Sequence, residues 1–192
     1  MKLKALATWA AVAVSAAVMA TAEPLRLKPA SPQPGAGSLK PGLAVRYAYP
    51  ADVKYLDQAE RALKNGAEPG PPLKGLDYAD TREGQKTLTS RKAWKVVADI
   101  SGYVKFDAPG IYEIDFLTND GIRAVIGGQL VGLFDGRQPC DSTFVTEVDA
   151  PKAGWYKLDI LYFQRQGTSC LHMRRGLKGK RVTWVPDTAF GH

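Results

Sequence analysis

The strongest constraint on the fold is a two-residue alternation of apolar and polar side chains in short segments beyond residue 42. One such segment has Tyr112, Ile114 and Phe116 in alternate positions, with Glu113 and Asp115 between them. Alternation of this kind puts the apolar side chains on one face of a strand and the polar ones on the other, solvated face. Gly-containing turns separate the segments and no helices alternate with them. This pattern predicts an antiparallel β-sandwich rather than a parallel α/β sheet.

One segment has a helical period instead. In residues 52–65 apolar residues recur at steps of three and four, Asp52 can cap the start, and Gly66 can end the helix. The predicted fold class is therefore all-β, a single antiparallel β-sandwich with one short inserted helix near 52–65. The expected strands are 43–49, 96–106, 112–116, 122–126, 130–131, 144–148, 156–162, 169–173 and 182–185.

The first 22 residues have the composition of a signal peptide. Lys2 and Lys4 precede an apolar, Ala-rich run, which ends in the small-residue pattern Ala20-Thr21-Ala22. An uncleaved membrane anchor is the alternative, but it needs about 20 strongly apolar residues. We expect cleavage near Ala22-Glu23, a secreted or periplasmic protein, and no transmembrane segment in the mature chain.

The remaining chain has the length of one domain. Residues 23–41 contain five prolines and few apolar residues, which predicts a flexible Pro-rich linker. The β-sandwich is expected over 42–185, followed by a C-terminal tail over 186–192. Removing residues 1–22, which hold two of the 26 Lys and Arg and none of the 19 Asp and Glu, leaves a net charge of +5. This mild excess is compatible with an anionic partner.

The two cysteines, Cys140 and Cys170, predict one disulfide in an exported chain. A metal pair or a reactive thiol is the alternative. A metal site would need further Cys or His ligands, and the only histidines are His172 and the C-terminal His192.

Five motifs occur in the order typical of one known module, and together they resemble the protective-antigen-type domain. The match runs from about residue 42 to 175. Members of that family are β-sandwiches found in glycosidases, fungal adhesins, toxins and signalling proteins, and several bind carbohydrate. The matching stretches are Gly42-Leu43-x-x-x-Tyr47, Ser101-Gly102-Tyr103, Ala108 to Phe116, Thr118 to Gly128, and Ala153 to Leu158 with Tyr162-Phe163.

The resemblance implies a binding site at the signature loop. In the adhesin branch, a pair of Asp residues in this loop holds a calcium ion that contacts sugar hydroxyls, as a hard cation with oxygen ligands can. This chain has Asn119-Asp120 there, and Gly127-Gly128 replaces a later Asp-Gly. The lost carboxylates lower the expected calcium affinity, so no cofactor is required and calcium at Asn119 and Asp120 is optional. Alternatively, Asn119-Asp120-Gly121 is only a hairpin turn.

Other side chains extend the candidate sites. The loop 132–141 is expected to complete the ligand-binding edge, which gives Asn119, Asp120, Gly121, Asp135 and Asp141 as candidate ligand-binding residues. Aromatic side chains can stack on sugars, although sandwiches bury most of them. The candidates for stacking are Tyr103, Trp155 and Trp184.

A basic run near the C-terminus is the candidate contact for an anionic partner. It consists of Arg174, Arg175, Lys178, Lys180 and Arg181. The alternative is a solvated, flexible segment. Nucleic acid is not expected as a partner, because no aromatic residues for base stacking are interleaved in the run.

Catalysis is not indicated. No hydroxyl, imidazole and carboxylate can be tied into a triad, and His172 lies in an expected strand, where packing explains it. The leading hypothesis is an exported non-catalytic binding module for carbohydrate or cell-envelope glycan. The alternative is a structural or protein-interaction module of the envelope that uses the same sandwich without binding sugar.

Overall fold

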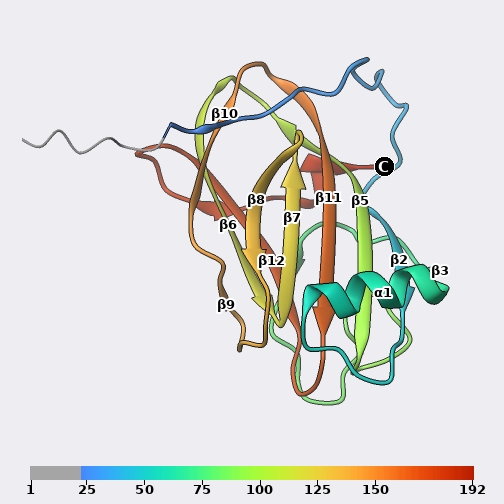
Figure 1. The fold of residues 1–192 in the computed structure, drawn as a ribbon. Coiled ribbons are helices and arrows are strands. Elements are labelled where there is room, and N and C mark those ends of the chain that lie inside the picture. Colours follow the sequence, from blue (N-terminus) through green and yellow to red (C-terminus); the bar gives the residue numbers. More distant parts are fainter. Residues whose placement is uncertain (1–22) are drawn as a thin grey trace, which may run out of the picture.

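The computed structural model describes residues 23–192, so the predicted signal peptide over 1–22 lies outside the described residues. Two sheets of seven strands each pack face to face (Figure 1). The predicted all-β sandwich with one helix is confirmed. Among residues 23–192 no helix combines the length and the apolar composition needed to cross a membrane.

The first sheet is built around β6 (Gly110–Asn119), which pairs with β10 (Thr146–Ala150) on one side and β12 (Cys170–Leu177) on the other. All of its pairings are antiparallel except that of β1 with β10. The smaller strands at its margins are β1 (Leu25–Arg26), β4 (Asp77–Tyr78), β9 (Asp141–Ser142) and β13 (Thr183–Trp184).

The second sheet has the order β3-β2-β5-β11-β7-β8, and β14 pairs with β5. Its longest pairing joins β5 and β11 over their full length of eleven residues. The bounds are β2 (Ala44–Ala48), β3 (Glu68–Pro69), β5 (Val96–Phe106), β7 (Gly121–Ile126), β8 (Gln129–Phe134), β11 (Gly154–Gln164) and β14 (Phe190–Gly191).

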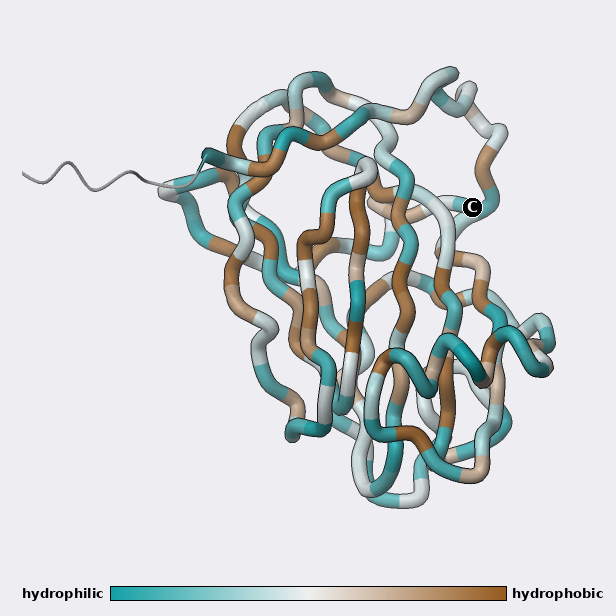
Figure 2. The backbone as a smooth tube through the Cα atoms, in the orientation of Figure 1, coloured by the Kyte–Doolittle hydropathy of each residue, from teal (hydrophilic) through white to brown (hydrophobic). Residues whose placement is uncertain are grey.

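The core lies between the two sheets, and hydropathy alternates along the strands that enclose it (Figure 2). Ile114 and Phe116 are fully buried there, as the alternation predicts. Burying an apolar side chain of this size stabilises the fold by about 1.5–3 kcal/mol. Asp115 departs from the expected solvated face because it is only 1 % exposed. Its carboxylate forms an ion pair with Arg174 and accepts a hydrogen bond of 2.7 Å from the Ser142 hydroxyl.

The helix α1 (Leu56–Gly66) lies across the outer face of the second sheet (Figure 1). Leu56 and Ala59 pack there against Val97 and Phe163. The predicted cap at Asp52 is wrong, because the helix begins four residues later. The first helical amide instead donates to the Asp135 carboxylate at 2.7 Å, and Asp52 forms an ion pair with Arg165 at 2.8 Å.

The expected flexible linker over 23–41 is wrong. Its residues pack against the sandwich: Leu27 is 1 % exposed, and the amides of Leu27, Lys28 and Ala30 donate to carbonyls of three other segments. The low apolar content of this stretch suggested that it could not pack. Backbone hydrogen bonds and the burial of Leu27 in the core hold it together.

The expected tail over 186–192 is also part of the fold. A single 3₁₀ turn, η1 (Asp187–Ala189), leads into β14, where Phe190 is 2 % exposed. Lys40 and His192 exchange two backbone hydrogen bonds of 2.8 and 2.9 Å. The sandwich therefore extends on both sides of the predicted domain 42–185, and the two terminal segments lie side by side.

The predicted disulfide between Cys140 and Cys170 is present, with the two Cα atoms 5.8 Å apart. It ties the loop before β9 to the start of β12. Closing a loop of this length stabilises a fold by about 3–4 kcal/mol in the chain-entropy description.

Candidate functional site

The stretch Asn119-Asp120-Gly121 is not the hairpin turn that it resembles. It carries the chain from β6 in the first sheet to β7 in the second, and the Asn119-Asp120 peptide bond is cis. The backbone carbonyl of Asn119 accepts a hydrogen bond of 2.5 Å from the buried Tyr162 hydroxyl. The side-chain nitrogen of Asn119, Nδ2, donates to the Thr168 hydroxyl at 3.2 Å. The hairpin prediction is wrong because this turn connects two layers rather than two neighbouring strands.

The Asp120 carboxylate lines a small cavity of about 300 Å³ together with Arg137, Gln138 and Arg165. Its Oδ2 accepts a hydrogen bond of 2.7 Å from the Arg165 amide. Burial raises the pKa of the Asp120 carboxyl, while the amides of Arg165 and Gln138 and the charge of Arg137 oppose that shift. The site therefore has one buried carboxylate and a cationic rim.

These residues do not fit a calcium ion. Calcium takes six to eight oxygen ligands, several of them carboxylate, and Asp120 brings a single carboxylate that already accepts a backbone hydrogen bond. Arg137 and Arg165 line the same cavity and would repel a cation. Within residues 23–192 no group of three or more His, Cys, Asp or Glu could hold a metal ion.

The other candidate ligand-binding residues do not join Asp120. Asp135 accepts the first amide of α1, and Asp141 accepts the Ser142 amide at 2.7 Å. Gly121 is buried, with the Phe163 ring where a side chain would begin. Loop 132–141 does reach the Asp120 cavity, but through Arg137 and Gln138, whereas the carboxylates of Asp135 and Asp141 bond backbone amides elsewhere.

The basic run does not form one free cationic surface. Arg174 is paired with the buried Asp115, and Lys178 forms an ion pair with Glu147 at 2.9 Å. Arg175 covers the Phe106 ring at 4.4 Å and donates to the Lys105 carbonyl at 2.7 Å. Burial lowers the pKa of Arg175. Lys178, Lys180 and Arg181 are the exposed residues of the run, beside the turn before β13.

A larger cavity of about 780 Å³ opens beside Trp184 on β13. The indole is 47 % exposed. The His172 ring lies 4.7 Å from it, tilted by 35°, and the Arg174 guanidinium lies 5.5 Å from its centre. These contacts fix an exposed aromatic ring at the wall of the cavity.

Polar side chains surround this ring. Asp77 on β4 bonds the His172 ring at 2.8 Å and lines the cavity with Lys74, Tyr78 and Asp187. Burial raises the pKa of Tyr78. An aromatic surface with a few convergent polar groups is the usual composition of a small-molecule site.

Comparison with known protein families identifies the family of this chain. The sequence model of the PA14 domain matches residues 82–188, more than half of the chain. The chain belongs to the PA14 domain family. The resemblance seen in the motifs is thereby confirmed, and a comparison with curated proteins gives no match.

Solved PA14 domains share the fold of this chain at low sequence identity. The PA14 domain of the antifreeze protein MpAFP has 15 % identity and a TM-score of 0.68, over 80 % of this chain and 91 % of that one. A PA14 sugar-binding domain from an RTX adhesin has 16 % identity and a TM-score of 0.62, over 79 % and 98 %. The epithelial adhesin 9 A domain of Candida glabrata, in complex with Galb1-4GlcNAc, has 15 % identity and a TM-score of 0.64, over 88 % and 95 %.

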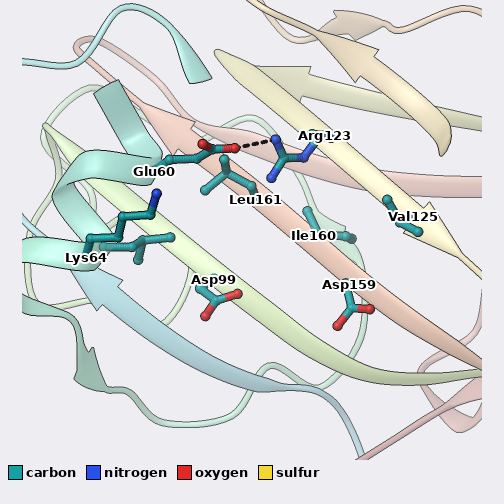
Figure 3. A pocket seen from close by; sticks show the side chains of 9 residues that line it. Glu60, Lys64, Asp99, Arg123, Val125, Asp159, Ile160 and Leu161 are labelled. Carbon is teal, nitrogen blue, oxygen red and sulfur yellow. Dashed lines mark hydrogen bonds and ion pairs between the residues drawn. The ribbon is translucent and has the colours of Figure 1, made fainter. Parts of the chain in front are cut away.

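A further cavity of this PA14 domain, about 430 Å³, lies between α1 and the outer face of the second sheet (Figure 3). Its lining mixes apolar side chains with charged ones and contains no aromatic ring. Glu60 forms an ion pair with Arg123 across it, and Asp159 is paired with Lys157 at 3.0 Å. Because its carboxylates are all paired within the protein, this cavity belongs to the packing of the helix on the sheet.

The Trp184 cavity was only partly predictable from the sequence. Trp184 was a stacking candidate, whereas Asp77, Tyr78 and Lys74 lie in a stretch whose polar composition gave no periodic signal. Of the other stacking candidates, Trp155 lines a separate cavity and Tyr103 is half-buried on β5. The aromatic character of Trp184 was the one usable signal.

Proposed function

We propose that this PA14 domain is an exported, non-catalytic module that binds glycan in the cavity beside Trp184. The half-exposed indole, held by His172 and Arg174 at the wall of a 780 Å³ cavity, carries the proposal. The volume lies in the range of small-ligand sites, about 300–1,000 Å³.

The composition of the cavity supports a sugar over other ligands. A pyranose has an apolar face of C–H groups and a rim of hydroxyls. A site for it therefore needs one flat aromatic surface for the C–H face and several polar side chains that hydrogen-bond the hydroxyls. Trp184 supplies the surface, and Asp77, Asp187 and Lys74 supply acceptors and a donor. The sugar-binding domain of the RTX adhesin and the sugar complex of the Candida glabrata adhesin support the same class of ligand.

The environment of the carboxylates supports binding rather than catalysis. The general acid of a glycosidase lies in an apolar pocket, whereas Asp77 is half-exposed and bonded to His172. Asp187 is exposed. The Thr89 hydroxyl donates to the Pro71 carbonyl at 2.6 Å, so it is not positioned as a nucleophile for His172.

Export is supported by the disulfide, because such bonds persist in oxidising compartments. Together with the predicted leader, it favours the periplasm or the extracellular space. Fractionation of cells that express the full chain tests this point. Recovery of the uncleaved chain with reduced cysteines from the cytoplasm would contradict it.

A screen against soluble oligosaccharides tests the function itself. The protein is titrated calorimetrically with neutral and acidic glycans, and the solutions are analysed afterwards for cleavage products. We expect saturable binding of at least one class and intact glycans. Uniformly flat titrations would overturn glycan binding, and release of shorter products would overturn the non-catalytic assignment.

A protein-interaction role is the second candidate, favoured by a different surface. Phe144 is 82 % exposed and has a φ of 78°, an uncommon conformation for a bulky residue. The Ser142 hydroxyl accepts its amide at 3.0 Å, and the neighbouring Val145 is 56 % exposed. A Phe144→Ser variant that loses an envelope partner while it keeps glycan binding would establish this second role.

A further inference from the structure

The two terminal segments, expected to lie outside the domain, enclose a second cavity of about 490 Å³. Its walls come from residues 34–41 at one end of the chain and from Asp187 to Gly191 at the other. Trp155 at the start of β11 lines this cavity, as Trp184 lines the first. The molecule thus has two tryptophan-lined cavities.

A third cavity of about 300 Å³ adjoins both of them. Asp187 and Thr188 line all three. Lys74 is shared by the third cavity and the one at Trp184, and Pro41 is shared by the third and the one at Trp155. The three cavities therefore follow one another as a groove, from Trp184 past the turn η1 to Trp155.

Trp155 is held in place by the N-terminal segment. Its amide donates to the Gln33 side chain at 2.8 Å, and its carbonyl accepts hydrogen bonds from the Gln33 side chain and the Ala30 amide at 2.9 Å each. The backbone of Trp155 is therefore fixed on both sides. A backbone that is already fixed lowers the ordering cost of ligand binding at this position.

The middle of the groove is polar. Asp187 lies at its centre, where the missing side chain of Gly75 leaves room for its carboxylate; a Cβ at Gly75 would lie 2.3 Å from the Asp187 Oδ1 atom. Lys74 lies toward the Trp184 end, and Lys40 and Lys105 lie toward the Trp155 end. Donors and acceptors thus alternate between two apolar platforms.

We infer that this groove binds a linear glycan along its length, with Trp184 and Trp155 as two separate stacking platforms. This inference rests on the proposed function and adds the class of glycan: an unbranched chain long enough to reach both rings. A single sugar unit, or the end of a branched glycan, would fill only one cavity and would leave Trp155 without a role.

Oligosaccharide ladders test the inference. Two ladders are titrated into the whole protein, β-1,4-linked N-acetylglucosamine oligomers and α-1,4-linked galacturonate oligomers, each from the dimer to the hexamer. For the ladder that binds, we expect the hexamer to bind at least about tenfold more tightly than the dimer, which corresponds to about 1.4 kcal/mol. Trp155→Ala should remove this gain, while Trp155→Tyr should retain most of it.

The outcomes distinguish a failure of the groove inference from a failure of the proposed function. Equal affinities for dimer and hexamer, or a hexamer affinity that Trp155→Ala leaves unchanged, overturn the groove and leave the Trp184 site intact. Absence of binding in both ladders overturns the proposed function together with the groove. Thermal unfolding of each variant is measured beside the titrations, and a Trp155→Ala protein that unfolds early is replaced in the comparison by Lys40→Gln, for which the same loss of the length gain is expected.

Discussion

The imidazole of His172 lies 4.7 Å from the indole of Trp184, with 35° between the ring planes. Trp184 on β13 is paired with Arg174 on β12, two residues beyond His172, and diagonal neighbours of this kind contact each other across a strand pair. Asp77 on β4 is the direct cross-strand partner of His172 and bonds its Nδ1 at 2.8 Å. Two short pairings in one sheet, β12 with β13 and β12 with β4, thus fix the position of a single exposed ring.

His172 is predicted to position Trp184 rather than to contact the ligand. His172→Ala should weaken glycan binding about three- to tenfold, within the range of an aromatic pair, about 0.5–1.5 kcal/mol. The emission of Trp184 should shift as its surroundings become more solvated. His172→Phe keeps a ring at this position and should restore most of the affinity. Equal losses with Ala and Phe would mean that the imidazole itself binds the ligand.

Arg174 is predicted to stabilise the fold through Asp115. Removing one partner of a buried ion pair leaves an uncompensated charge and costs about 3–5 kcal/mol; because Arg174 is 36 % exposed, we expect a value near the lower end, about 3 kcal/mol. Chemical denaturation of Arg174→Met measures it. The double variant Asp115→Asn/Arg174→Met should recover part of the loss, and no recovery would show that the guanidinium acts through its packing on Trp184.

Asp120 is predicted to lower stability at neutral pH. Burial raises the pKa of its carboxyl in the folded chain, so the folded state binds more protons and the free energy of unfolding falls as pH rises from the unfolded value near 3.8. Asp120→Asn should unfold at a higher temperature than the native chain at pH 7. The difference should vanish below about pH 4, where the carboxyl group is protonated in both states.

The control for Asp120 is Glu83→Gln, which removes an exposed carboxylate. That variant should show no such dependence on pH. A lower stability of Asp120→Asn at every pH would contradict the account, because it would mean that the hydrogen bond from the Arg165 amide needs a charged acceptor.

Calcium is predicted to leave the protein unchanged. A ligand at a hundred times its dissociation constant stabilises a fold by about 2.7 kcal/mol, so a calcium site would raise the unfolding temperature measurably. Because Arg137 and Arg165 line the cavity of Asp120, we expect no shift on adding millimolar calcium and no loss of glycan binding with a chelator. A shift that disappears in Asp120→Asn would restore the calcium-dependent interpretation.

Much of the sandwich follows from the sequence because alternation reports burial directly. The apolar positions of β6 are buried where the two-residue period places them, and Cys140 and Cys170 meet as predicted. The period fails at Asp115, where a polar side chain is buried by partners that arrive from distant segments, Arg174 and Ser142. Because these partners are distant in the sequence, no local pattern of residues predicts that Asp115 is buried.

The candidate site was harder to predict for a related reason. Residues 23–41 and 186–192 join the fold through a few buried side chains, such as Leu27 and Phe190. Backbone hydrogen bonds, as between Lys40 and His192, complete the contact and do not depend on apolar composition. The proline and glycine content of these segments therefore suggested flexible ends, although they enclose the groove. The signature loop drew attention to Asp120, whereas the aromatic cavity depends on the short strands β4 and β13, with two residues each.

The central claim is that Trp184 forms the glycan-binding surface, and a comparison of two tryptophan variants tests it most directly. Trp94 is matched in exposure, 45 % against 47 %, and its indole nitrogen donates to the Gly167 carbonyl away from the cavity. The affinity of each variant for the best glycan of the screen is measured by calorimetry. We predict that Trp184→Ala weakens binding at least about tenfold, or about 1.4 kcal/mol, and that Trp94→Ala leaves it unchanged. Native affinity in Trp184→Ala, in a protein that remains folded, would contradict the account.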